Sequence, residues 1–163
     1  MTSRAGQLRV AAFVVMSLAG SGFRSVSGQR PGSPQDPDPA HVAIIGTDYA
    51  FVQLPTTLAA GPTLFSFENR GSKRHELSIA LLKSGVPAES LLATAGRLAS
   101  LSSRAVSDSI VGILIARPTE RSGGQLYVRL IAGRTYIVVC TLRDTPDAPP
   151  HMSLGMVGSF QVR

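Results

Sequence analysis

Short apolar segments separated by turn signals run through the chain from residue 41 onward, and this rhythm restricts the fold more than any other feature. The segments are rich in β-branched and aromatic residues: HVAIIGTDYAFVQL, AGPTLFSFEN, HELSIALL, GQLYVRL, RTYIVVC and GMVGSFQVR. Pro55 closes the first segment, and Asn69-Arg70-Gly71 is a turn signal after the second. Short strands punctuated by turns are typical of β-sandwiches and barrels. The sequence therefore predicts an all-β fold.

Two stretches of the chain carry more specific expectations. GQLYVRLIAGRTYIVVCTL indicates two antiparallel strands joined at Ala132-Gly133. Residues 87–110 interrupt the strand pattern, because Pro87 suits a first helical turn and the leucines that follow have helical spacing. We therefore expect one or two helices inserted between strands, and a loop over residues 117–124.

The first 28 residues have the pattern of a secretory signal peptide. MTSRAGQLR is short and positively charged, and the apolar run VAAFVVMSLAGSGF is too short and too broken by glycine for a membrane-spanning helix. Val26 and Gly28 fit a small-residue cleavage site, which makes Gln29 the new N-terminus. We expect an exported protein, periplasmic or extracellular, with no membrane span after the signal is removed. A buried N-terminal helix is the alternative.

The next segment, QRPGSPQDPDPA at residues 29–40, carries four prolines and no large apolar residue. It is expected to be an extended, solvated linker that adds nothing to the core. Residues 41–163 then form one domain, which agrees with the usual size of roughly 100–200 residues.

The charge of the chain argues against nucleic acid as a partner. Loss of Arg4, Arg9 and Arg24 with the signal, and of no acidic residue, lowers the formal net charge from +6 to +3. Nucleic-acid binding needs a dense basic face, and the aromatic residues are not interleaved with Arg or Lys. The chain also lacks a Gly-rich phosphate loop and an evident nucleophile with its base. We expect no nucleic-acid partner and no enzyme activity.

The stretch CTLRDTPDAPPHMSLGM gathers the single cysteine, one of three histidines and two of four methionines. Cys140 follows a strand that is expected to be central and buried, and a turn-rich loop with three prolines separates it from His151. A strand–loop–strand unit places Cys140, His151 and Met156 at one end of the sheet. His75 begins another strand directly after a polar turn, so it is also at a strand end.

These four donors suit one kind of metal site. Two imidazoles and a thiolate in a plane, with a weak axial thioether, form the blue-copper arrangement used for electron transfer. Met152 is a second thioether, but its place next to His151 makes it the poorer axial donor. Each donor also has a simpler role: Cys140 as a small buried apolar residue, His75 on the surface at a strand end, His151 as a loop cap, and Met156 in the core.

The motifs NRGSKRHEL and CTLRDTPDAPPHMSLGM, followed by VGSFQV, resemble those of the cupredoxin, or blue copper, family over roughly residues 41–163. The resemblance implies a Greek-key β-sandwich that holds one copper ion. It implies His75, Cys140 and His151 as equatorial ligands and Met156 as the axial ligand. It also implies a monomeric one-electron carrier, cycling between Cu(II) and Cu(I), which docks on a transient redox partner.

The chain departs from the family pattern at two places. Ten residues separate Cys140 from His151, whereas small cupredoxins have only a few. Glu76 follows the first histidine where Asn is common, and a carboxylate cannot donate a hydrogen bond to the thiolate. We expect His151 to lie near solvent as the electron port, His41 to be solvated, and the pair Asp144 and Asp147 to be solvated turn residues.

Two other functions stay open on the sequence. One is a cupredoxin-fold module that carries copper or binds a protein without redox activity. The other is an exported structural sandwich whose helical insertion binds another protein. A second catalytic copper is not supported, because only His41 remains after His75 and His151 are used.

Overall fold

A computed structural model describes residues 37–89, 92 and 107–163 of the chain. In these ranges the elements are β1 (Ala40–Thr47), β2 (Ala50–Val52), β3 (Thr57–Leu58), β4 (Gly61–Asn69), β5 (His75–Leu82), β6 (Ser107–Ala116), β7 (Leu126–Leu130), β8 (Thr135–Val139), the short 3₁₀ helix η2 (His151–Leu154) and β9 (Val157–Val162). The sandwich begins at Ala40, the last residue of the predicted linker. None of the described helices is long and apolar enough to cross a membrane.

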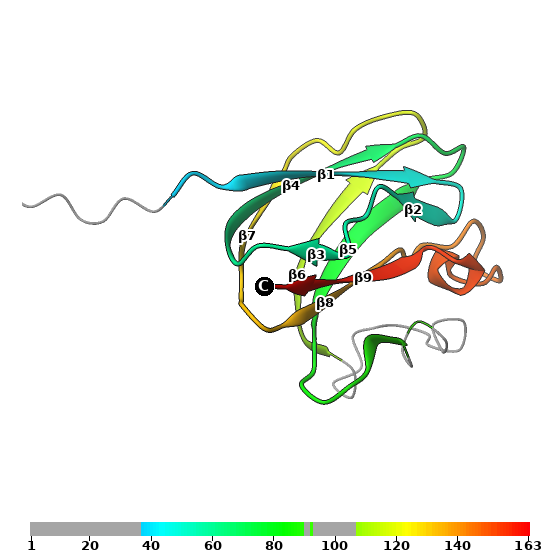
Figure 1. Cartoon of the computed structure of the whole chain (residues 1–163). Coiled ribbons are helices and arrows are strands. Elements are labelled where there is room, and N and C mark those ends of the chain that lie inside the picture. Colours follow the sequence, from blue (N-terminus) through cyan, green and yellow to red (C-terminus); the bar gives the residue numbers. More distant parts are fainter. Residues whose placement is uncertain (1–36, 90–91, 93–106) are drawn as a thin grey trace, which may run out of the picture. The chain divides into compact units, whose positions relative to one another are not determined.

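The strands form two sheets that face each other (Figure 1). The first has the order β2-β1-β4-β7 and the second the order β3-β9-β8-β5-β6. β1 pairs in parallel with β4, whereas β8 pairs antiparallel with both β5 and β9. Along the described strands the chain passes from one sheet to the other five times: at β2–β3, β3–β4, β4–β5, β6–β7 and β7–β8. The predicted all-β sandwich is confirmed.

The predicted pairing across Ala132-Gly133 is wrong. β7 pairs with β4 in the first sheet, whereas β8 lies in the second sheet. A hairpin and a crossover between sheets share the same local sequence pattern, which is two apolar segments on either side of a turn. The turn here contains Gly133, whose φ is 74°. The burial of the two strands distinguishes the two cases. β8 is buried along most of its length, as a central strand requires, whereas β7 alternates between buried and more exposed residues.

The end of the predicted helical insertion, residues 107–110, lies instead in strand β6. β6 pairs with the whole of β5, from His75 opposite Ala116 to Leu82 opposite Ser107. Residues 90–91 and 93–106 lie outside the described part, so the helical insertion stays a prediction. The predicted loop at residues 117–124 is confirmed between β6 and β7.

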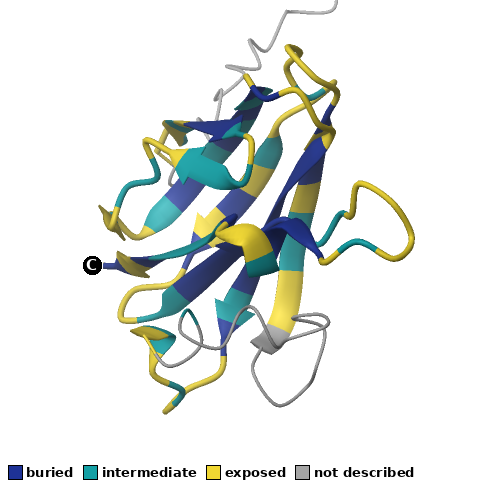
Figure 2. Ribbon diagram, turned by 90° about the vertical axis from the view of Figure 1, so that its right-hand side faces the viewer, coloured by how far each residue is buried: buried dark blue, intermediate teal, exposed yellow. Residues whose placement is uncertain are grey.

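The core between the sheets is aromatic and continuous with the donor-rich end. Tyr136 stacks on Phe160 with ring centroids 5.2 Å apart, and both belong to a buried cluster that also contains Cys140 and Met156. Figure 2 shows the buried residues in dark blue along strands of both sheets. A second, smaller cluster consists of Leu82, Ile137, Val139 and Met152. Because β8 contributes to both clusters, Cys140 emerges from a strand that is packed on both faces.

Candidate metal centre

Three buried side chains, His75, Cys140 and His151, bring their donor atoms within 4.8 Å of one another. Nδ1 of His75 lies 3.0 Å from Nδ1 of His151, and Sγ of Cys140 lies 3.4 Å from Nδ1 of His151 and 3.9 Å from Nδ1 of His75. The point equidistant from these atoms is about 2.0 Å from each, which matches a metal–imidazole bond of about 2.0–2.1 Å and is about 0.3 Å shorter than a metal–thiolate bond of about 2.3 Å. The triangle therefore fits one metal ion.

The turn between β4 and β5 places His75. Asn69 is fully buried and donates from Nδ2 to the carbonyls of Lys73, at 2.7 Å, and Ala116, at 3.2 Å. Its Oδ1 accepts the N–H of Gly71 at 2.9 Å. These bonds close the turn and fix it to the end of β6, so β5 starts at His75. The predicted turn signal thus has a direct structural role.

Asp48, from the turn between β1 and β2, holds the same loop from the other side. Its Oδ1 accepts the N–H groups of Ser72, at 2.8 Å, and Lys73, at 3.2 Å, and its Oδ2 accepts the Ser72 hydroxyl at 2.7 Å. The same Oδ1 lies 3.2 Å from Nε2 of His75. The Ser72 hydrogen bond, helped by bonds from His75 and the loop N–H groups, lowers the pKa of Asp48 to about 2. Asp48 is therefore ionised at neutral pH.

Cys140 and Glu76 connect the ends of β8 and β5. The N–H of Glu76 donates to Sγ of Cys140 at 3.4 Å, and Oε1 of Glu76 accepts the N–H and the hydroxyl of Thr141 at 2.8 and 2.7 Å. The backbone thus supplies the hydrogen bond to sulfur, and the carboxylate ties down the cysteine loop as an acceptor. Burial raises the pKa of the Cys140 thiol to about 11, so the thiol is protonated at neutral pH in the metal-free protein.

The long loop after Cys140 folds back so that His151 and Met156 return to the same end. The N–H of His151 donates to the Leu142 carbonyl at 2.8 Å, and the N–H of Met152 donates to the Cys140 carbonyl at 2.8 Å. The N–H of Cys140 in turn donates to the Met156 carbonyl at 3.1 Å. The expected convergence of Cys140 and His151 is confirmed. Met156 is fully buried in the cluster that contains Cys140, and its role as a ligand stays a prediction.

Both imidazoles bind a carboxylate on their outer side. Nε2 of His151 lies 3.2 Å from Oδ1 of Asp144, as Nε2 of His75 does from Asp48. The Tyr49 hydroxyl donates to Oδ2 of Asp144 at 2.6 Å, and this bond lowers the pKa of Asp144. Asp144 is exposed in a bend, as predicted, but it also contacts His151 and Tyr49, which the sequence did not indicate. Sequence reasoning also missed Asp48 and Tyr49, which no local motif marks.

The carboxylates decide where the imidazole protons lie. An ionised carboxylate only accepts hydrogen bonds, so each Nε2 carries a hydrogen, and the Nδ1 atom of each ring faces the centre. Burial lowers the pKa of His75, which keeps this ring neutral. The two Nδ1 atoms and the nearby thiol therefore face one point, as the donors of a metal site must.

The expected exposure of His151 is wrong. The residue is 1% exposed, and the Tyr49 ring lies edge-on to it with centroids 5.1 Å apart. Pro150 and Met152 beside it are also buried. Met152 belongs to the smaller cluster, apart from the one that contains Cys140 and Met156. His41 is exposed on β1, as expected.

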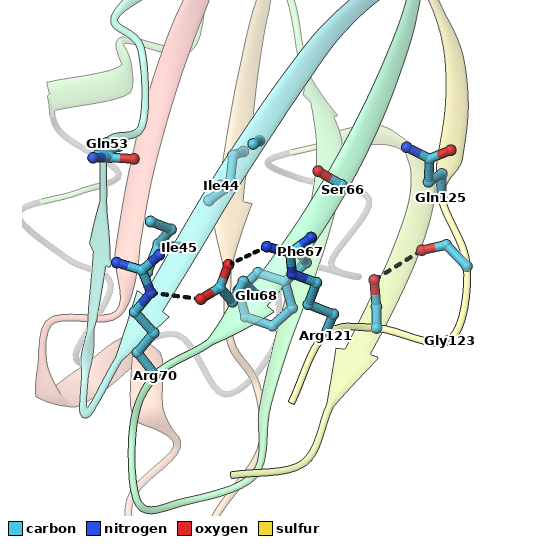
Figure 3. A pocket seen from close by; sticks show the side chains of 13 residues that line it. Ile44, Ile45, Gln53, Ser66, Phe67, Glu68, Arg70, Arg121, Gly123 and Gln125 are labelled. Carbon is cyan, nitrogen blue, oxygen red and sulfur yellow. Dashed lines mark hydrogen bonds and ion pairs between the residues drawn. The ribbon is translucent and has the colours of Figure 1, made fainter. Parts of the chain in front are cut away.

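A surface pocket of about 510 Å³ lies over β1 and β4 (Figure 3). Arg70 and Arg121 point toward Glu68 from two sides, at 2.6 and 3.3 Å. Neither the two buried histidines nor Cys140 lines this pocket, so it is separate from the metal centre.

Comparisons with known proteins bear on the fold. No protein-family model matches the sequence, and no curated protein is significantly similar to it. The structure of dithionite-reduced auracyanin from Roseiflexus castenholzii has a TM-score of 0.51 and 19% identity, covering 76% of this chain and 97% of that one. Auracyanin B has a TM-score of 0.51 and 20% identity, covering 78% and 92%. Auracyanin A, a "blue" copper protein from Chloroflexus aurantiacus, has a TM-score of 0.46 and 23% identity, covering 77% and 99%. The first two similarities confirm the predicted cupredoxin fold.

Proposed function

We propose that this chain with the cupredoxin fold is an exported blue-copper protein that transfers single electrons. His75, Cys140 and His151 would hold the ion, with Met156 as a further thioether donor. The observation that carries the proposal is the convergence of two imidazole Nδ1 atoms and one thiol at 3.0–3.9 Å in the buried end of a sandwich.

The donor set favours copper over other metals. A thiolate and two imidazoles suit copper in both oxidation states, and a weak thioether fits an electron-transfer site better than a structural zinc site, which is usually tetrahedral and closed. Bound copper supplies one-electron chemistry between Cu(II) and Cu(I). The chain's own contribution is to hold the donors in one geometry and to exclude water.

A carrier fits the chain better than an enzyme. The two histidines of the metal centre leave only His41, which is exposed on β1, so the chain offers no further imidazole cluster for a substrate-binding copper. A carrier also needs a transient redox partner, which we propose docks on a monomer near the β1–β2 turn and the cysteine–histidine loop. Figure 1 shows this turn and the orange loop at the same end of the sandwich.

The test is copper loading of the purified protein with one equivalent of Cu(II). An intense blue absorption band, the electron paramagnetic resonance spectrum of a copper–thiolate centre and reversible bleaching by a reductant are expected. The variant Cys140→Ser should lose the band, and the matched control His41→Ala should keep it. A colourless protein whose Cys140 still reacts with an alkylating agent would favour a module that carries copper or binds a protein without redox activity.

Export has its own test. Expression of the full chain in a bacterium should yield protein outside the cytoplasm that begins near Gln29. Retention of Met1 in a cytoplasmic product would contradict the predicted signal peptide.

A further inference from the structure

The outer side of the metal centre is built from two loops that are distant in sequence. Asp48 and Tyr49 come from the turn between β1 and β2, and Asp144 comes from the loop between Cys140 and His151. Asp48 contacts His75, Asp144 contacts His151, and the Tyr49 hydroxyl joins the two loops by its bond to Asp144. Each imidazole thus has a carboxylate on the ring edge opposite the nitrogen that faces the centre.

Tyr49 adopts a backbone conformation that a bulky residue rarely adopts. Its φ is 65°, in the left-handed region. Residues held there cluster at functional sites, because the surrounding contacts must stabilise the unfavourable conformation. Here the conformation directs the hydroxyl to Asp144 at 2.6 Å and the ring edge-on to both His75 and His151, with centroid distances of 6.2 and 5.1 Å. Tyr49 therefore fixes the position of Asp144.

The two carboxylates affect the oxidised and the reduced centre differently. A carboxylate behind a metal-bound imidazole fixes the ring orientation and makes the ligand more basic. Reduction adds one electron and lowers the positive charge of the centre by one, so the attraction to a nearby negative charge weakens. A negative charge at Asp48 or Asp144 consequently stabilises Cu(II) more than Cu(I).

We propose that Asp48 and Asp144 are positioning residues that fix both imidazoles with Nδ1 toward the metal and lower the reduction potential of the copper centre. This inference rests on the proposed copper function. Reduction takes one electron from a one-electron donor, and the carboxylates neither form nor break a covalent bond. Asp48 also binds the loop N–H groups of Ser72 and Lys73, so Asp144 offers the cleaner test.

The chain provides a matched control three residues away. Asp147 lies in the same loop and is exposed, and Asp147→Asn makes the same charge change as Asp144→Asn without touching an imidazole. Asp144→Asn keeps an oxygen that can accept from Nε2 of His151, so it removes the charge and preserves the hydrogen bond. Asp144→Ala removes both.

The first measurement is the midpoint potential of the copper-loaded protein at neutral pH. It comes from a mediated redox titration in which the absorption band is monitored. At the wild-type midpoint, Asp144→Asn should increase the ratio of reduced to oxidised protein at least tenfold, a shift of about 59 mV for one electron. Asp147→Asn should change this ratio less than threefold. Equal shifts for the two variants would overturn the proposal, since they would reflect net charge alone.

The second measurement uses the metal-free protein and reads the histidine tautomers from ¹⁵N chemical shifts. Hydrogen on Nε2 and none on Nδ1 is expected for His75 and His151, and also for His151 in Asp144→Asn. Asp144→Ala should give a mixture at His151. Hydrogen on Nδ1 of His151 in the wild type would overturn the positioning role. If copper loading itself fails, the proposed function fails, and this measurement still decides whether the carboxylates position the rings.

Discussion

Replacement of Gly71 by alanine tests the link between the β4–β5 turn and the metal centre. A Cβ at residue 71 would overlap Oδ1 of Asp48 and lie 3.0 Å from the Asp48 backbone nitrogen and 3.1 Å from its Cγ. Asp48 cannot move away freely, because that same Oδ1 accepts from Ser72 and Lys73 and contacts His75. The variant must therefore open the turn or release His75.

The expected cost follows from these contacts. Overpacking costs about 1–3 kcal/mol, and a hydrogen bond to a charged group contributes about 1.5–3 kcal/mol. The Asp48 side chain is 38% exposed, so water replaces part of what is lost. We expect Gly71→Ala to lower the free energy of unfolding by about 2 kcal/mol, which is about 30-fold in the equilibrium constant. Loss of the contact to His75 should also weaken copper binding by about 10–100-fold.

Urea unfolding of the metal-free protein measures the first effect, and competition with a copper chelator measures the second. Gly123→Ala is the matched control, because a Cβ at that position would meet no atom within 4 Å. A surface substitution of this kind changes the free energy of unfolding by less than about 0.5 kcal/mol. The reasoning is refuted if the Gly71 variant matches the Gly123 variant in both measurements.

Other substitutions test the pH dependence, the cysteine loop and the core. Burial raises the pKa of Cys140 from 9.0 to about 11, so the folded metal-free protein keeps the thiol proton to a higher pH than the unfolded chain does. This difference contributes about 2–3 kcal/mol to the free energy of unfolding below pH 9.0, and the contribution should be lost as the pH rises to about 11. Urea unfolding at several pH values in this range should show the loss of stability in the wild type, and Cys140→Ala should lack it. Glu76→Ala should cost about 1–3 kcal/mol by thermal unfolding, since Thr141 loses its acceptor, whereas Glu76→Gln, which keeps Oε1, should cost under about 1 kcal/mol. Phe160→Ala should cost about 3–5 kcal/mol, and a loss under about 1 kcal/mol would contradict the stacked core.

Local signals explain what the sequence predicted well. The Asn69-Arg70-Gly71 turn directly precedes β5, and the β-branched run before Cys140 is the buried strand β8. Both donors stand at strand ends, where a short-range pattern is enough to place them. The prolines and the 3₁₀ helix bring His151 back, so the order of donors along the chain indicated the cluster correctly.

Strand β6 was missed for a physical reason. Its centre contains Gly112, which usually weakens a strand. In the structure the missing side chain makes room for Leu126 of β7 in the facing sheet, because a Cβ at Gly112 would overlap the Leu126 side chain. The N-terminal part of β6, residues 107–110, also directly follows a stretch of sequence with helical spacing. Long-range packing, which no local window contains, therefore decided the element.

The carboxylates of the metal centre were missed for a related reason. Asp48 lies 27 residues from His75, and Tyr49 lies 95 residues from Asp144. The order β2-β1-β4-β7 brings the β1–β2 turn beside the β4–β5 turn through the parallel pairing of β1 with β4. A polar and aromatic pair, Asp48-Tyr49, between two short strands was the only signal in the sequence, and its meaning depends on this topology.

The bonds that position the donors are formed among the protein's own groups. Asn69 and Asp48 fix the loop before His75, the Met156 carbonyl accepts from the N–H of Cys140, and the Leu142 carbonyl accepts from that of His151. These bonds join loops that are distant in the sequence and hold the three donors together at one end of the sandwich. The same contacts keep the two imidazole Nδ1 atoms 3.0 Å apart beside Sγ of Cys140, which is the arrangement that the proposed copper site needs.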